Sequence, residues 1–167
     1  MADAITKLEA DHDRIEALFE RLKHADEAET RRLGSEVCHL VRIHMALEEE
    51  LLYPALRGRP EAKEDKLDEG LVEHDTGKLL INDVLADPEQ EKLAPKLQVL
   101  GEQMEHHHKE EEQPEKGVFA MARKAGLDLA ALRRAMDARE KELRAETGRG
   151  ELPAADMNFV DVEASEG

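Results

Sequence analysis

The sequence predicts an all-α protein: an antiparallel, up-down-up-down four-helix bundle with an additional C-terminal helix and a weakly ordered tail. Three observations support this fold class. Apolar residues recur at intervals of three and four along four long segments, aromatic residues make up only 2% of the chain, and charged residues make up 38%. This spacing is typical of amphipathic helices, whereas strands are rich in aromatic and β-branched residues. At 167 residues the chain has the size of one domain.

The first two segments each carry one apolar stripe. The first stripe runs from Ile5 to Leu22, and the second runs from Val37 to Ala55. Pro54 should perturb the last turns of the second helix, because proline has no backbone N–H to donate. The sequence RGRPEAKED that follows is predicted to be a loop.

The third stripe runs from Leu67 to Leu85. The fourth helix is predicted to begin at Asp87-Pro88, with the aspartate as N-cap and the proline as the first helical residue. Its stripe consists of four apolar residues in strict helical register: Leu93, Leu97, Leu100 and Met104.

Pro114 and Gly117 interrupt the pattern after the fourth helix, and a further helix should open at Asp128. Its apolar stripe is thin, so we expect it to pack on the outside of the bundle or at a subunit contact, where it could form a homo-oligomer. The expected organisation is therefore a bundle over residues 1–126, a C-terminal helix over 127–147 and a flexible tail over 148–167.

The charge and the termini exclude several classes of partner. Forty acidic residues against 24 basic ones give a net charge of −16, which repels nucleic-acid phosphates and anionic lipids. The N-terminus lacks a signal-peptide core, and no stretch approaches the roughly 20 apolar residues of a membrane span. A lone cysteine, Cys38, agrees with a reducing compartment. We expect no nucleic-acid partner, no membrane partner and a cytoplasmic location.

Each of the four stripes is interrupted once by a histidine. These residues are His12, His44, His74 and His107. Two of the helices add a glutamate one turn later, Glu48 after His44 and Glu111 after His107. Because residues four apart share a helix face, each His-x-x-x-Glu pair points toward the same part of the core.

The spacing of these residues also indicates a twofold repeat. His12 precedes His44 by 32 residues, and His74 precedes His107 by 33. Four imidazoles and two carboxylates facing each other in an apolar core would be costly without a cation. Two iron ions, each taking two histidines and sharing both glutamates, would use all six groups, with manganese and zinc as alternatives. The competing interpretation is that the histidines are hydrogen-bonded core residues.

Helical register selects among neighbouring histidines and glutamates. Only His107 continues the stripe of the fourth helix, while His106 and His108 lie about 100° to either side and should face neighbouring helices or solvent. The same argument prefers Glu111 and Glu48 to the acidic residues beside them, which turn away: Glu49, Glu50, Glu110 and Glu112. Three further residues are not expected to be ligands: His24 and His39 at the surface, and Tyr53 closing the second helix.

The motifs resemble the haemerythrin-like family, specifically its HHE cation-binding branch. The matching segments are DHDRIEALFERL, HMALEEELLYPAL, the Glu73-His74 pair, and HHHKEEE followed by FAMARKAGLD. The resemblance implies a four-helix bundle with a non-haem, carboxylate-bridged di-iron centre, whose ligands would be His12, His44, Glu48, His74, His107 and Glu111.

Two departures from the family pattern bear on function. Oxygen-carrying haemerythrins use five histidines, whereas only four lie in register here, which argues against reversible oxygen carriage. The sequence QPEKGV, which follows the last glutamate of HHHKEEE, also bends the chain close to Glu111, so the orientation of Glu111 is less well determined than that of Glu48.

Three functions are compatible with these residues. The first is binding or reduction of dioxygen, peroxide or nitric oxide at the two-iron centre. The second is iron storage, delivery or sensing without turnover, and the third is a purely structural helical module. An enzyme built on this site would be an oxidoreductase acting on one of those oxidants.

Overall fold

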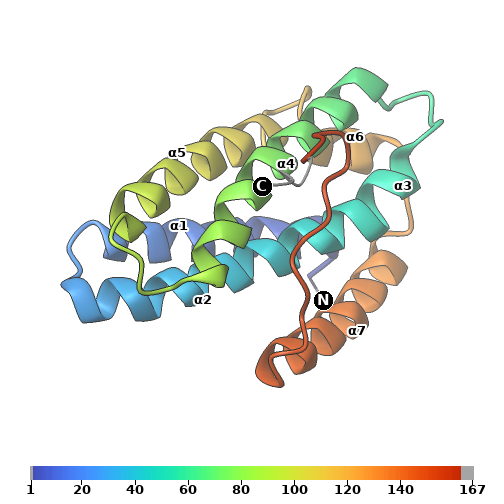
Figure 1. Cartoon of the computed structure of the whole chain (residues 1–167). Coiled ribbons are helices and arrows are strands. Elements are labelled where there is room, and N and C mark those ends of the chain that lie inside the picture. The colour runs from blue at the N-terminus through green and yellow to red at the C-terminus, as the bar shows by residue number, and fades with distance from the viewer. Residues whose placement is uncertain (1, 163–167) are drawn as a thin grey trace.

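The computed structural model describes residues 2–162, and these residues contain helices and no strands. Four long helices form a bundle: α1 (Ala4–Leu22), α2 (Glu27–Leu47), α4 (Glu64–Ala86) and α5 (Leu93–Glu111). Helix α1 packs against α2 and α5, and α4 packs against the same two helices (Figure 1). The all-α prediction is confirmed, while the up-down-up-down order stays a prediction. None of the described helices is long and apolar enough to cross a membrane.

Aspartate N-caps begin three of the helices. The Asp3 carboxylate accepts a hydrogen bond from the Thr6 backbone N–H at 2.9 Å at the start of α1, and Asp26 caps α2 in the same way. Asp128 accepts from the Ala131 N–H at 2.9 Å and opens α7 (Leu129–Gly148), as the sequence predicts. Each cap satisfies an N–H group that has no partner within its own helix.

The second helix ends in a π-helical turn. Helix α2 passes into the π-helix η1 (Glu48–Leu52) and then into the short α3 (Tyr53–Leu56). The Tyr53 N–H donates to the Glu48 carbonyl, five residues earlier, and Pro54 follows within the first turn of α3. The perturbation expected near Pro54 is therefore a widened turn that begins at Glu48, and such turns are frequent at functional sites.

The start of the fourth helix differs from the sequence prediction. Residues 88–92 form turns, and α5 begins at Leu93. The Asp87 side chain accepts from the Glu89 N–H, two residues later, which makes a local turn in place of a helix cap. Pro95 lies in the first turn of α5, where its missing N–H costs nothing.

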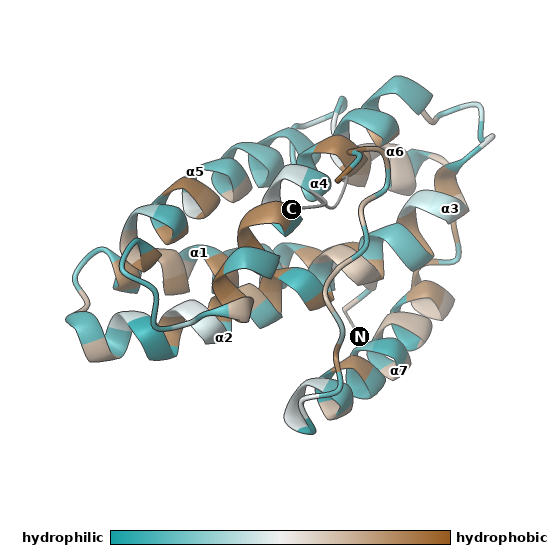
Figure 2. Ribbon diagram, viewed as in Figure 1, coloured by the Kyte–Doolittle hydropathy of each residue, from teal (hydrophilic) through white to brown (hydrophobic). Residues whose placement is uncertain are grey.

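Two apolar clusters fill the bundle and leave a polar layer between them. One cluster includes Leu8, Leu71 and Phe119, and the other includes Ile15, Ile81 and Met104. Figure 2 shows hydrophobic residues where the helices face one another and hydrophilic residues on the outer surfaces. Along α1 and α4, the histidines of the sequence pattern lie between residues of the two clusters.

The segment after α5 turns sharply and returns the chain to the bundle. Glu115 adopts a left-handed backbone conformation with φ of 66°, and α6 (Val118–Lys124) buries Phe119 and Met121. A Cβ added to Gly117 would lie 2.2 Å from the Glu111 carbonyl oxygen. The chain can therefore make this turn without disturbing the last turn of α5 only because residue 117 is glycine.

Helix α7 lies against α1 and α2 and buries Met136 and Leu143. From its end the chain runs without helix or strand along α4 (Figure 1). The Asn82 amide exchanges two hydrogen bonds with the Ala155 backbone at 2.8 and 2.9 Å. These contacts with α4 were not predicted from the sequence. The last part of the expected tail, residues 163–167, lies outside the described residues.

We expect Gly117→Ala to destabilise the protein, because its Cβ would meet backbone atoms that cannot move aside. Overpacking of this kind costs about 1–3 kcal/mol. Gly148→Ala is the matched control, since a Cβ there meets nothing within 4 Å. The free energy of unfolding of metal-free protein, measured in denaturant, tests this expectation. Equal values for the two variants would show that the approach to Glu111 is not tight.

Candidate metal centre

The structure brings the six sequence-predicted ligands into one buried layer. Each has an exposed fraction of 2% or less. Their donor atoms form two groups, and within each group the atoms lie within 4.8 Å of one another. One group contains His12 and His44, the other contains His74 and His107, and both contain Glu48 and Glu111.

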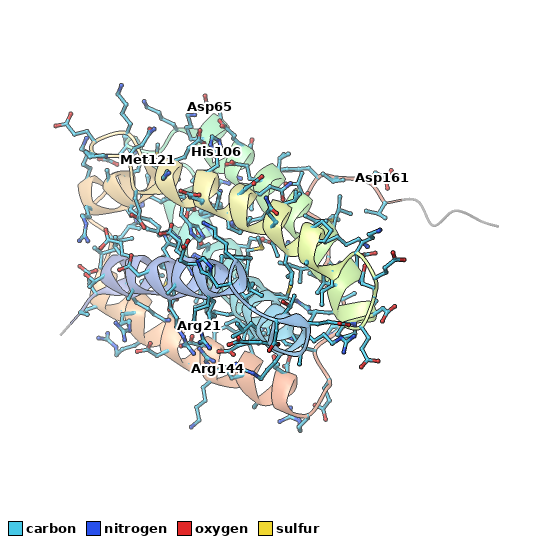
Figure 3. The ribbon with its side chains drawn as sticks, turned by 90° about the vertical axis from the view of Figure 1, so that its left-hand side faces the viewer. Arg21, Asp65, His106, Met121, Arg144 and Asp161 are labelled. Atoms are coloured by element: carbon cyan, nitrogen blue, oxygen red, sulfur yellow. The ribbon has the colours of Figure 1, made fainter. Side chains whose placement is uncertain are left out.

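Five elements supply these side chains. His12 lies on α1, His44 on α2 and His74 on α4, while α5 carries His107 and Glu111 one turn apart. Glu48 is the first residue of the π-helix η1. In Figure 3 the ribbons of α1 and α5 run across the face nearest the viewer.

The four imidazoles form two pairs with nearly identical geometry. The Nε2 atoms of His12 and His44 are 3.0 Å apart, and those of His74 and His107 are also 3.0 Å apart. The rings of each pair have centroids 4.7 Å apart, with interplanar angles of 65° and 68°. The twofold repeat of the sequence is thus a twofold arrangement of donor atoms.

Each imidazole directs its other nitrogen, Nδ1, at a carboxylate oxygen. The four pairs are His12 with Glu112 at 2.6 Å, His74 with Glu49 at 2.7 Å, His107 with Glu73 at 3.2 Å and His44 with Asp11 at 3.4 Å. Because an ionised carboxylate only accepts hydrogen bonds, these contacts favour a proton on Nδ1 and a lone pair on Nε2. Two lone pairs facing each other at 3.0 Å repel unless a proton or a metal cation lies between them.

The sequence analysis missed these four outer carboxylates. Glu49 and Glu112 do lie off the apolar stripes, as helical register indicates. Each nevertheless contacts a histidine that lies on a neighbouring helix. The repeat contains a signal for them, because acidic residues occupy matching positions in both halves. An acidic residue directly precedes each lone histidine, and a second glutamate directly follows each bridging glutamate. Each outer carboxylate thus fixes the ring orientation of one ligand.

Among the described residues, the two central glutamates have buried oxygens without hydrogen-bond partners, although Glu48 Oε1 is in close contact with Nε2 of His44 and Glu111 Oε2 lies 3.3 Å from Nε2 of His12. These atoms are both carboxylate oxygens of Glu48 and Oε2 of Glu111. Burial and the neighbouring Glu111 carboxylate raise the pKa of Glu48. The Tyr53 hydroxyl donates to Glu111 Oε1 at 2.5 Å, and burial together with Glu111 raises the pKa of Tyr53 well above its usual value. Tyr53 is therefore a neutral donor that holds one bridging carboxylate.

The charge of the site also acts on the histidines. Burial alone would lower the pKa of His44, but the carboxylates of Glu48 and Asp11 outweigh it and raise this pKa to about 10. Burial likewise opposes the charged form of His107, yet Glu111 and Glu73 raise its pKa well above the usual value. The layer is strongly negative, so it attracts protons when no other cation is bound.

His108 is a buried histidine that the register argument placed outside the site. Its exposed fraction is 1%, and its ring stacks on that of His12, with centroids 3.7 Å apart and planes 10° apart. Donor atoms of His12, His44 and His108 form a third buried group within 4.8 Å. Within residues 2–162, the Nδ1 atom of His108 has no hydrogen-bond partner; Glu16 Oε1 lies 3.7 Å away. Burial and the neighbouring His12 lower the pKa of His108, so it is a neutral imidazole.

The remaining histidines lie elsewhere. The side chain of His106, labelled in Figure 3, is 68% exposed and lies 3.3 Å from Glu110 Oε1 on the surface of α5. His24 is 80% exposed, and His39 is half-buried. Cys38 lies in the apolar core, where burial raises the pKa of its thiol to about 12.

The donor set fits a metal cation. Facing imidazole lone pairs and unpartnered carboxylate oxygens are costly in a buried layer, and a cation satisfies both. Neutral imidazoles combined with carboxylates suit iron, manganese or zinc, whereas magnesium and calcium prefer oxygen ligands alone.

Comparison with known proteins agrees with this geometry. A family model described as the hemerythrin HHE cation binding domain matches residues 3–122. No curated protein and no solved structure matches the chain. The family match spans well over half of the sequence and includes all six residues of the central layer. The chain therefore belongs to the haemerythrin HHE cation-binding family.

Proposed function

We propose that this protein holds two iron ions and uses them to bind or reduce a small oxidant: dioxygen, peroxide or nitric oxide. The observation that carries the proposal is the pair of facing imidazole nitrogens on each side of two shared carboxylates. One ion would take Nε2 of His12 and His44, and the other would take Nε2 of His74 and His107. Glu48 and Glu111 have oxygen atoms within reach of both groups, so each would bridge the two ions.

The residues around the ligands support a preorganised site. Four outer carboxylates hold the imidazole rings in orientation, and the Tyr53 hydroxyl holds one oxygen of Glu111. Preorganisation of this kind strengthens metal binding, because less side-chain freedom is lost when the cation enters. Bound iron would supply one-electron redox chemistry and coordination positions that the protein leaves open.

His108 is a candidate fifth histidine at the ion held by His12 and His44. Its ring is buried and neutral, one of its nitrogens lies within 4.8 Å of donor atoms of His12 and His44, and Nδ1 has no hydrogen-bond partner among the described residues. The second half of the repeat contributes this histidine, and the matching position after His44 is Met45. The two ions would therefore have unequal ligand sets.

A groove lies beside the site. It has a volume of about 1100 Å³, lies between α1 and α5, and is lined in part by Glu16 and Met104. The Glu16 carboxylate lies 3.7 Å from Nδ1 of His108, whose ring stacks on His12. The groove therefore approaches the ligand layer from the side of the first histidine pair.

Reaction with an oxidant is the direct test of the proposed function. Protein loaded anaerobically with ferrous iron should change its absorption spectrum when dioxygen, peroxide or nitric oxide is added, and consume the oxidant faster than the metal-free chain. A change that occurs once per loaded protein indicates binding or sensing without turnover. Identical spectra before and after all three additions would contradict the proposal and favour iron storage or delivery.

Substitution of neighbouring histidines tests the ligand assignment. We expect wild-type protein and His106→Ala to hold two iron ions per chain, because His106 is at the surface. His107→Ala should lose at least one ion, and His108→Ala should hold its iron less tightly. Elemental analysis after gel filtration measures the content. Two ions retained by His107→Ala would overturn the assignment, and full retention by His108→Ala would remove only His108 from the ligand set.

Removal of the metal should loosen the bundle. A ligand that binds only the folded state stabilises it, by about 2.7 kcal/mol when its free concentration is 100 times its dissociation constant. The midpoint of thermal unfolding should therefore rise with added iron in wild-type protein, and rise less in His107→Ala. Equal midpoints for metal-free and loaded wild-type protein would show that these residues do not bind the cation in the folded state.

A further inference from the structure

The two halves of the site differ in how their outer carboxylates are held. Glu49, which contacts His74, is 15% exposed, whereas Glu112, which contacts His12, is 40% exposed. Two donors reach Glu49 Oε1: the Lys78 ammonium at 2.7 Å and the Asn158 side-chain amide at 3.1 Å. Among the described residues, the hydrogen bond with His12 is the only one at the Glu112 carboxylate.

The sequence explains why this support exists on one side only. Lys78 lies four residues after His74, and the matching position after His12 is Glu16, a carboxylate. Glu16 therefore cannot donate a hydrogen bond to Glu112 as Lys78 does to Glu49. The two halves share the geometry of the donor atoms but differ in the residues that hold the outer carboxylates in position.

The C-terminal segment supplies the second donor to Glu49. Residues 155–160, which we call the C-terminal strap, are held along α4. Buried Asp75 is the main anchor: its carboxylate accepts the backbone N–H groups of Asn158, Phe159 and Val160 at 2.7–2.9 Å. The strap also accepts a hydrogen bond from Lys78, through the Asp156 carbonyl at 2.8 Å.

We propose that the C-terminal strap positions His74 through Asn158, Lys78 and Glu49, and thereby slows release of the metal ion held by His74 and His107. The inference rests on the proposed two-metal site. With both donors on Oε1, the Glu49 carboxylate cannot rotate freely, so its Oε2 stays 2.7 Å from Nδ1 of His74. The imidazole is then fixed with Nε2 toward the metal, and loss of such outer partners typically weakens metal binding 10–100-fold.

Metal release distinguishes this inference from a general stabilising role of the strap. Wild-type protein and variants are loaded with ferrous iron under anaerobic conditions and mixed with a coloured chelator. Absorbance then gives the number of ions released and the rate of each phase. Asn158→Ala removes the amide, which donates to Glu49 and also to Asp75 at 3.1 Å, without adding a charge beside these carboxylates. Glu151→Gln, just before the strap, is the control, because the one ion pair of its side chain among the described residues is with Arg149.

We expect wild-type protein to release two ions in two phases, and Asn158→Ala to accelerate one phase by up to about tenfold, the lower end of the effect of losing an outer partner itself, while the other stays unchanged. Glu112→Gln should accelerate the other phase, and Glu151→Gln should match wild type. Unchanged rates in Asn158→Ala, or equal acceleration of both phases, would overturn the inference. A total below two ions in wild-type protein would instead contradict the two-metal site, so the two failures are distinguishable. Far-UV circular dichroism of each variant checks that the helices are intact.

Discussion

The structure depends on charge compensation in a layer of buried donors. Two glutamates and four histidines lie in the middle of an otherwise apolar bundle, with Nε2 atoms facing each other at 3.0 Å and carboxylate oxygens that have no hydrogen-bond donor in the described part of the chain. Buried groups of this kind are destabilising alone, yet they bind a cation strongly because water does not compete. The helices, the outer carboxylates and the C-terminal strap all act on the position of these donors.

The residues around the buried donor layer support it at increasing distance from its centre. The apolar clusters on both sides exclude water, and the outer carboxylates orient each imidazole. Beyond them, Tyr53 holds Glu111, and Lys78 with Asn158 holds Glu49. The acidic character of the whole chain has a local counterpart here, because these carboxylates create the negative potential that raises the pKa of His44 and His107. A metal cation can replace those protons, which couples binding to proton release.

Helical periodicity predicted the all-helical fold and the six central residues, because a polar residue that interrupts a long apolar stripe must face the core. It did not predict what lies beside each stripe. His108 is off the stripe of α5 but is covered by α1, and Glu49 and Glu112 reach histidines on neighbouring helices. Such contacts depend on how close neighbouring helices lie, and the spacing of apolar residues within a single helix does not give that distance. The predicted start of the fourth helix was wrong, because the Asp87 side chain accepts a hydrogen bond from the nearby Glu89 N–H and forms a local turn. The strap was not predicted, because backbone N–H groups hold it and these leave no apolar pattern in the sequence.

The central claim is that the six residues form one centre in which two metal ions share Glu48 and Glu111. X-ray absorption at the iron edge of the loaded protein tests it most directly, because it reports the neighbours of each iron atom. We expect a second iron at roughly the 3.5–4 Å typical of two-metal sites, with nitrogen and oxygen as nearest neighbours. A spectrum with no iron neighbour, from protein that holds its full iron content, would contradict a shared centre.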